Sequence, residues 1–304
     1  MTEHTQNITS SPFASTQSFR ITQKKRRPSD GVLRALIYLS AGLTVLILAG
    51  LFIYVILRGA PQITWEFLST APSALHKRFG ILPSVINTLY TVVITLVIST
   101  PIGIGSAVYL NEYAKRGRLV AVIEFTIETL AGIPSIIYGL FGAIFFGTFF
   151  KLGYSIMTGA LTLTIMVLPL IIRTTQEALK TVPNSYREGA LGMGAGKWHM
   201  IRTIILPSSV SGIITAVILS IGRIVGESAA LLYTAGSGTN MPTDLLEHPF
   251  STGASMTVQM YLGVSNGLYI EQGFGIALVL MVLVLIINTI TKIIGSRSQK
   301  RAQG

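Results

Sequence analysis

Long apolar runs alternate with short polar connections along this chain. Each run has at least about 20 residues, the length that an α-helix needs to cross the hydrocarbon core of a bilayer. Six such runs lie at residues 33–57, 82–110, 121–149, 154–176, 208–232 and 273–294. They lack the strict alternation of apolar and polar residues that marks the strands of a membrane barrel. The pattern therefore predicts an all-α integral membrane protein with six transmembrane helices.

The composition supports this class of protein. Half of the 304 residues are hydrophobic and only 12% are charged, and the mean hydropathy is +0.62. The chain thus carries more apolar surface than a soluble domain of this length can bury. The absence of Cys excludes a disulfide framework and a thiolate metal site. The four His residues follow no metal-ligand spacing, so we expect neither a metal nor a cofactor in this chain.

The distribution of basic residues predicts the orientation in the membrane. The formal net charge is +11, but Lys and Arg adjoin the apolar runs rather than alternating with aromatic residues as in a nucleic-acid site. Seventeen of them lie in both terminal segments and in the second-to-third and fourth-to-fifth connections, whereas the opposite connections hold only Arg58, Lys77, Arg78 and Lys151. Because Lys and Arg are enriched on the cytosolic side, we expect both termini in the cytosol.

The polar segments define the predicted domain organisation. About 30 polar residues precede the first run and no small-residue cleavage site follows it, so the run is interpreted as a retained anchor rather than a signal peptide. The outward loop over 233–272 lacks Lys and Arg, is rich in Gly, Ser, Thr and Pro, and is expected to be irregular. The predicted parts are a disordered cytosolic tail (1–30), the first transmembrane helix with its extracytoplasmic connection (31–80), a core (81–295) with a distinct loop at 177–207, and a cytosolic C-terminal tail (296–304).

The loop between the fourth and fifth runs carries the most specific pattern. Gly194 stands where a sharp reversal requires a positive φ, and Pro207 stands where a helix can begin at little cost for a missing N–H. We interpret the loop as a helix-turn-helix elbow on the membrane surface that presses into a partner; the alternative is an ordinary interhelical loop. The residues that carry the pattern are Glu188, Gly189, Ala190, Gly194, Ile204, Leu206 and Pro207.

The same loop offers no phosphate-binding site for ATP. Its nearest approach, at residues 192–198, has the wrong glycine spacing and a Trp in place of the Ser or Thr that would bind Mg²⁺. An ATPase that moves the elbow would therefore be a separate polypeptide, and this chain is expected not to be an enzyme.

Two arginines inside apolar runs are candidate ligands for an anion. Arg223 lies about 15 residues into the fifth run, roughly 22 Å along a helix, and cannot easily reach the cytosolic surface. Glu227 follows at i+4, so the two side chains are expected to pair on one helix face. Gly222 and Gly226 flank the arginine and would admit a second helix or an anion. Either this is a structural ion pair, or the guanidinium binds an oxyanion such as phosphate in bidentate fashion.

Arg173 is the second intramembrane cation. It lies near the cytosolic end of the fourth run, where an arginine can also extend to the surface without binding a substrate. Glu124 and Glu128 in the third run are interpreted as interfacial or packing residues, because paired carboxylates repel an anion. In the same run, Pro134 predicts a kink, and Gly139 and Gly142 predict a face for close packing.

Four segments together resemble a known family. They are NEY at 111–113, LAGIPSIIYGLFG at 130–142, LPLIIRTT at 168–175 and GRIVGESAAL at 222–231. With the elbow, which resembles the EAA loop apart from Gly189 in place of the usual Ala, they resemble phosphate-uptake ABC permeases of the PstA type over about residues 80–290.

The resemblance implies a type I ABC importer permease of MetI-like architecture in the bacterial inner membrane. Its implied partners are a homologous sister permease, an extracytoplasmic phosphate-binding protein and a dimeric cytosolic ATPase that holds ATP and Mg. In that family the arginines that match Arg173 and Arg223 are linked to phosphate translocation, and Glu227 belongs to the matching motif.

Other functions stay open at this level. A sulfate or molybdate permease would use the same arginines for an oxyanion of similar size. A secondary anion transporter would also need intramembrane arginines, but no inverted repeat or coupling-ion ligand is evident. A membrane scaffold or sensor without transport activity would account for the loops but not for the buried cations.

Overall fold

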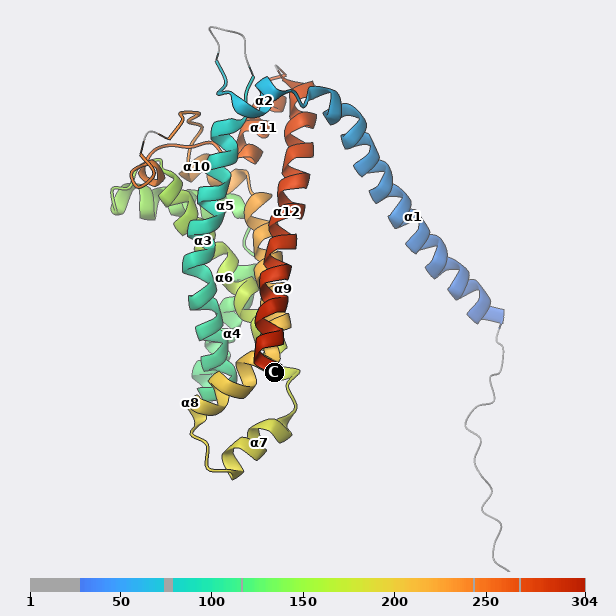
Figure 1. Ribbon diagram of the computed structural model, residues 1–304, viewed down its shortest axis with the longest axis vertical. Helices are drawn as coiled ribbons and strands as arrows, with labels where there is room; N and C mark the ends of the chain where they lie inside the picture. Colours follow the sequence, from blue (N-terminus) through green and yellow to red (C-terminus); the bar gives the residue numbers. More distant parts are fainter. Residues whose placement is uncertain (1–27, 74–78, 116, 243, 268, 304) are drawn as a thin grey trace, which may run out of the picture. The chain divides into compact units, whose positions relative to one another are not determined.

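The structure is a computed structural model that describes residues 28–73, 79–115, 117–242, 244–267 and 269–303 (Figure 1). Every regular element in these ranges is a helix. The chain divides into two compact units, residues 1–52 and 53–304. What is described of the first unit is the start of α1 (Pro28–Gly59). Residues 1–27 of the predicted disordered tail lie outside the described residues, and α1 begins at Pro28.

Among the described residues, five helices are long and apolar enough to cross a membrane, or six if one sharply bent pair is counted as a span. These helices overlap the six apolar runs and confirm the prediction of an all-α integral membrane protein. The five spans are Gly31–Gln62, Leu82–Tyr113, Ile156–Lys180, Lys197–Val225 and Ile270–Gly295.

Four helices pack side by side in the second unit: α3 (Leu82–Val108), α6 (Ile156–Lys180), α9 (Leu206–Val225) and α12 (Ile270–Gln303) (Figure 1). Of the candidate spans, α6 is the most buried, and Leu163, Val167 and Ile171 on it are fully inaccessible. Small hydroxyl side chains let α3 approach it, and Thr95 Oγ1 donates a hydrogen bond to the carbonyl of Ala160 at 3.2 Å.

The third apolar run is broken rather than kinked. Its two halves meet at 101°. The helix of the first half ends at Ala131 with Gly132 as its C-cap, because Pro134 lacks an N–H and disfavours a helical conformation in the residue before it. Across the break, Tyr138 Oη donates a hydrogen bond to the carbonyl of Leu130 at 2.8 Å. The run consists of α4 (Arg118–Ala131), α5 (Ser135–Gly142) and a π-helical segment, η3 (Ala143–Phe149).

The close-packing face predicted on this run is confirmed. A Cβ at Gly139 would lie 2.8 Å from the Cα of Ala230 in α10 (Ala229–Thr234), and a Cβ at Gly142 would collide with Thr162 of α6. A larger residue at Gly139 would separate α5 from α10, and a larger residue at Gly142 would separate α5 from α6.

The fifth run differs from its predicted limits. Pro207 is the second residue of α9, as expected, but helical structure already begins at Lys197 and ends at Val225. The helix α8 (Lys197–Met200) continues through a π-helical segment, η4 (Ile201–Ile205), into α9. The N–H of Leu206 bonds to the carbonyl of Ile201 in this π-turn, so the helix continues up to a proline that offers no N–H.

The connections on one end of the bundle contain more helix than predicted. After α1 come η1 (Ala60–Gln62) and α2 (Trp65–Ser69). The loop expected to be irregular over 233–272 contains η5 (His248–Phe250) and α11 (Met256–Ser265). The side chain of Ser255 starts α11 by accepting a hydrogen bond from the N–H of Val258.

Candidate coupling and translocation sites

The predicted elbow is present at the end of the bundle opposite α2 and α11 (Figure 1). Its first helix, α7 (Asn184–Gly192), is followed by a turn and then by α8. Gly194 in the turn has φ +82°, which confirms the predicted positive φ, a conformation that costs a residue with a Cβ about 1–2 kcal/mol. A Cβ there would meet no atom within 4 Å, so backbone strain rather than crowding is the reason for glycine.

Several large apolar side chains of the elbow are exposed. The side chain of Met193 is 84% exposed and that of Trp198 is 60% exposed, and Tyr186 and Leu191 are about half exposed. Glu188 and Gly189 lie on the exposed side as well. Large apolar side chains gathered on a short polar connection are typical of a protein–protein contact.

Other residues of the elbow are fixed to the bundle by packing. Ala190 is buried and belongs to a cluster with Leu179 and Val182. The same cluster includes residues of the helical run that follows the turn: Met200, Ile201 and Ile205, with Ile204 and Leu206 partly buried against them. The predicted residues of the elbow therefore divide into an exposed set and a buried set.

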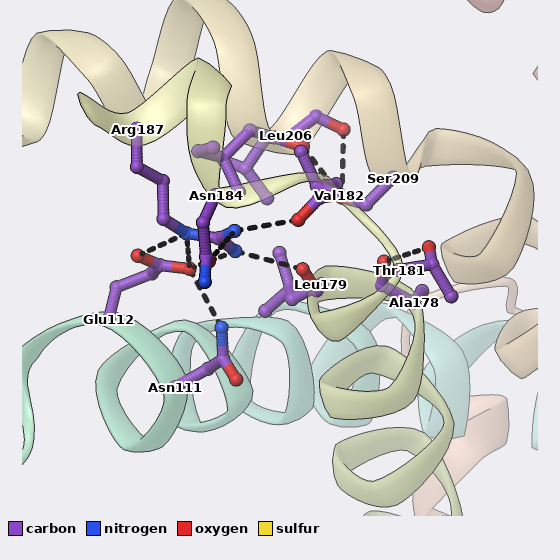
Figure 2. A network of polar contacts seen from close by, with 11 residues as sticks. Asn111, Glu112, Ala178, Leu179, Thr181, Val182, Asn184, Arg187, Leu206 and Ser209 are labelled. Atoms are coloured by element: carbon purple, nitrogen blue, oxygen red, sulfur yellow. Dashed lines mark hydrogen bonds and ion pairs between the residues drawn. The ribbon is translucent and has the colours of Figure 1, made fainter. Parts of the chain in front are cut away.

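A buried ion pair adds a polar attachment that sequence reasoning missed (Figure 2). Arg187 of α7 donates from Nη2 to Glu112 Oε1 at 2.8 Å, and the side chains are only 17% and 4% exposed. The same guanidinium donates to the carbonyls of Leu179 at 2.9 Å and Val182 at 2.8 Å. In the sequence Arg187 counted only as a basic residue, and its partner lies 75 residues away.

Arg173 is held by α4. Its Nη2 donates hydrogen bonds to Glu128 Oε1 and, at 3.2 Å, to the backbone carbonyl of Glu124. Its side chain is 29% exposed, whereas that of Glu128 is 67% exposed. Glu128, which was interpreted as an interfacial or packing residue, also provides the counterion of a candidate substrate ligand. The only sequence signal for this role was an acidic residue inside an apolar run.

The expected pair between Arg223 and Glu227 is not formed. Helix α9 ends at Val225 with Gly226 as its C-cap, so Glu227 does not lie one turn further on the same helix. Glu227 Oε1 instead accepts a hydrogen bond from the N–H of Ala230 at 3.0 Å, and its carbonyl accepts one from Thr257 Oγ1 at 2.7 Å. Glu227 is therefore a local anchor for the start of α10.

Arg223 itself lies on an open face of α9. Its side chain is exposed within this chain, and a Cβ at neighbouring Gly222 would meet nothing within 4 Å. The space beside Gly222, which was predicted to admit a second helix or an anion, is thus unfilled by this chain. Arg173 and Arg223 share no hydrogen-bond partner among the described residues.

Comparisons with known proteins agree with this architecture. Residues 99–303 match the family described as binding-protein-dependent transport system inner membrane component. The probable ABC transporter permease protein YqgI of Bacillus subtilis is 36% identical over 233 residues, which are 77% of this chain and 79% of that protein. The phosphate transport system permease protein PstA 1 of Mycobacterium tuberculosis is 31% identical over 285 residues, which are 89% of this chain and 90% of the relative.

A solved structure shares the fold. It is the crystal structure of a bacterial alginate ABC transporter in complex with an alginate pentasaccharide-bound periplasmic protein. The match has a TM-score of 0.65 and 16% identity, and covers 90% of this chain and 96% of the other. At this identity the likeness concerns the fold and not the substrate.

Proposed function

Because this chain belongs to the family of binding-protein-dependent transport system inner membrane components, we propose that it is the transmembrane permease subunit of an ATP-driven importer of inorganic phosphate. The relatives confirm the resemblance to ABC permeases of the PstA type. The chain forms the translocation path with a homologous sister permease and is coupled to a separate ATPase.

The assignment of coupling to an ATPase rests on the elbow, which has both exposed residues and residues packed into the bundle. Its exposed side presents Glu188 and Gly189 together with Met193 and Trp198, while Ala190 is packed into the bundle. We assign the exposed side to a groove on the ATPase. Gly194 sets the angle of the elbow, and the run through Ile204, Leu206 and Pro207 joins it to α9. ATP and Mg are held by that partner.

The substrate assignment rests on the two intramembrane arginines and on the names of the relatives. A guanidinium offers a fork of N–H donors that matches the oxygens of a phosphate. Arg223 has no carboxylate partner among the described residues and lies on an open face, so it can receive an anion directly. Arg173 already has Glu128 as a counterion, so an anion that binds Arg173 has to compete with this carboxylate. Glu227 shapes the chain next to Arg223 through its bond to α10.

Further partners and the orientation belong to the same proposal. An extracytoplasmic binding protein delivers phosphate to the end of the bundle that holds α2 and α11. The elbow faces the cytosol, and both termini lie on that side, as the distribution of basic residues predicts. The protein then resides in the bacterial inner membrane.

The competing function is transport of another oxyanion. The Bacillus subtilis relative is named only as a probable ABC transporter permease, and guanidinium groups bind sulfate or molybdate by the same geometry as phosphate. This alternative keeps every structural assignment except the substrate.

Reconstitution tests the proposal. The chain, its sister permease and the ATPase are placed in liposomes with the binding protein outside and ATP inside, and uptake of labelled phosphate, sulfate and molybdate is measured. Phosphate uptake that requires both ATP and the binding protein is the expected result. Uptake of sulfate or molybdate but not phosphate would refute the substrate, and ATP-independent uptake would refute the importer class.

A further inference from the structure

The proposed function leaves one sequence motif without a role, namely Asn111-Glu112-Tyr113. These residues form the end of η2 (Tyr109–Tyr113), a π-helical segment that directly extends α3. Single π-turns within helices often occur at functional positions. We propose that this segment receives the movement of the elbow and that α3 transmits it to the loop at the other end of the bundle. The inference rests on the proposed coupling to an ATPase.

The first half of the elbow is attached to η2 by the ion pair described above (Figure 2). Asn111 Nδ2 donates to Glu112 Oε1 at 2.7 Å and so orients the carboxylate toward Arg187. The guanidinium also donates to the carbonyl of Leu179 in the last turn of α6 and to that of Val182 just after this helix. A buried carboxylate cannot be left without its cation at low cost. Movement of α7 away from η2 is therefore strongly opposed.

The second half of the elbow is attached to the same segment by a different kind of contact. The Nζ of Lys197 in α8 lies 5.0 Å from the centre of the Tyr113 ring, within the range of a cation–π interaction. The two contacts come from opposite sides of the turn at Gly194. The two helices of the elbow therefore contact two adjacent residues of η2: α7 contacts Glu112, and α8 contacts Tyr113.

The far end of α3 is attached to the opposite loop by equally buried contacts. The side chain of Asn87 is 1% exposed; its Nδ2 donates to the carbonyl of Ala254 at 3.1 Å, and its Oδ1 accepts from His248 Nε2 at 2.7 Å. Thr88 Oγ1 accepts the N–H of Met256 at 3.0 Å. Residues 248–256 thus depend on α3 for their position at the start of α11.

These attachments lie at the two ends of one helix. The 27 residues of α3 span roughly 40 Å at 1.5 Å per residue, and along its length α3 packs against α6. A displacement of the elbow therefore carries η2 with it and reaches the loop that contains His248. The same helix can carry a displacement in the opposite direction. A binding protein that engages this loop then displaces α3 and η2, and through them the elbow, and in this way changes ATP hydrolysis.

The test uses the complete complex and compares ATP hydrolysis with and without the loaded binding protein. Glu112→Gln combined with Arg187→Gln removes both buried charges at once, so that no unpaired charge destabilises the fold. We expect basal hydrolysis and the amount of assembled complex to be retained, while stimulation by the binding protein falls about tenfold, within the usual range of allosteric coupling. Tyr113→Leu, which keeps an apolar side chain, should reduce the same ratio to a smaller extent.

A variant at the far end separates transmission from a local defect of the elbow. Asn87→Leu leaves the elbow contacts intact and is expected to lower the same stimulation ratio without loss of basal hydrolysis. The control is Arg58→Gln combined with Glu271→Gln. This double variant removes an ion pair whose side chains are about half exposed. This pair lies outside α3, and its loss should leave the ratio unchanged.

Normal stimulation in the Glu112→Gln, Arg187→Gln variant or in Asn87→Leu would overturn the proposal. If the ratio falls only in proportion to the amount of assembled complex, α3 serves packing and not transmission, which also overturns it. The substrate is tested separately. If the wild-type complex is stimulated by a binding protein loaded with sulfate or molybdate and not with phosphate, the phosphate assignment fails while the same ratio still tests the role of α3.

Discussion

Arg173 in α6 and Glu128 in α4 are joined by an ion pair that ties the fourth apolar run to the first half of the broken third run. Among the described residues of α4, only Ile127 is buried, so this ion pair is a main polar contact of the helix with α6. The pair makes an intramembrane cation tolerable. It also means that an anion can bind Arg173 only in competition with a carboxylate of this chain.

This competition gives a prediction for transport. Glu128→Gln should lower the KM for phosphate, because the guanidinium no longer has a charged intramolecular competitor. Arg173→Gln should strongly reduce uptake, and the double variant should stay inactive. The matched control is Glu124→Gln, one turn earlier on α4, where only the backbone carbonyl contacts Arg173. Recovery of uptake in the double variant would mean that the pair only stabilises the fold.

The turn of the elbow gives a second prediction. Gly194→Val introduces a β-branched residue at φ +82° and should cost about 1–2 kcal/mol or more, whereas Gly194→Asn should be tolerated better because Asn adopts this conformation more readily. Glu188→Lys leaves the backbone unchanged and alters only the exposed face. Both Gly194→Val and Glu188→Lys should abolish uptake while the permease remains in the membrane. Wild-type uptake in these two variants, measured against membrane abundance, would contradict the assignment of the elbow.

Local features of the fold were predictable from the sequence because they depend on local chemistry. Apolar runs located the helices, since length and hydropathy decide what can cross a bilayer. The positive φ of Gly194 followed from the reversal, and the close packing at Gly139 and Gly142 followed from the absence of a side chain. The 101° bend could be located at Pro134 but not measured, because its size depends on the docking of α5 on α10.

The polar contacts of the site were not predictable, because they join residues far apart in the chain. Nothing in the spacing around Arg187 indicates a partner at Glu112, and the partner of Arg173 lies 45 residues away. The expected pairing of Arg223 with Glu227 failed for a local reason. The i, i+4 rule assumes a continuous helix, and Gly226 ends α9 between the two residues.

The orientation of the chain gives a third prediction, which the absence of native Cys makes easy to test. A cysteine at Ser237 should react with an impermeant thiol reagent added from outside, and a cysteine at Ser298 should react only after the membrane is opened. Labelling of intact cells or oriented vesicles measures this directly. The reverse pattern would place the elbow outside, away from any cytosolic ATPase.

The contact of His248 with Asn87 gives a prediction of pH dependence. Burial lowers the pKa of His248 from its ordinary value of 6.5, because the charged imidazolium is disfavoured away from solvent. The unfolded chain therefore takes up a proton at higher pH than the folded chain. The free energy of unfolding should be highest above 6.5 and should decrease as the pH falls below it toward the lowered pKa.

Thermal unfolding of the detergent-solubilised protein at several pH values checks this dependence. His248→Gln removes the titrating group and keeps a side chain that can donate to Asn87 Oδ1, so the decrease below pH 6.5 should be smaller in the variant than in the wild type. An identical pH dependence in both proteins would assign acid destabilisation to other groups, such as exposed carboxylates.

The last prediction concerns Arg223, whose surroundings differ from what the sequence implied. With Glu227 bound to the N–H of Ala230, no carboxylate among the described residues has to be removed before an anion reaches the guanidinium. Arg223→Gln should therefore abolish phosphate uptake without affecting assembly, because the amide keeps some hydrogen bonding but not the charge that offsets desolvation of the anion. Arg223→Lys should restore uptake only in part, since an ammonium lacks the bidentate fork.

Glu227 separates the two possible roles of this region. Glu227→Gln retains an oxygen that can accept the Ala230 N–H and should leave uptake largely intact, whereas Glu227→Ala loses this bond and should destabilise the start of α10 by about 1 kcal/mol. Combining Glu227→Gln with Arg223→Gln should not restore activity, because the two side chains do not form a pair in this chain. Uptake, binding-protein-stimulated ATP hydrolysis and membrane abundance of the single and double variants measure this. A transport-competent double variant would show that Arg223 is needed only to balance the charge of Glu227, and the phosphate path would then have to be sought at Arg173.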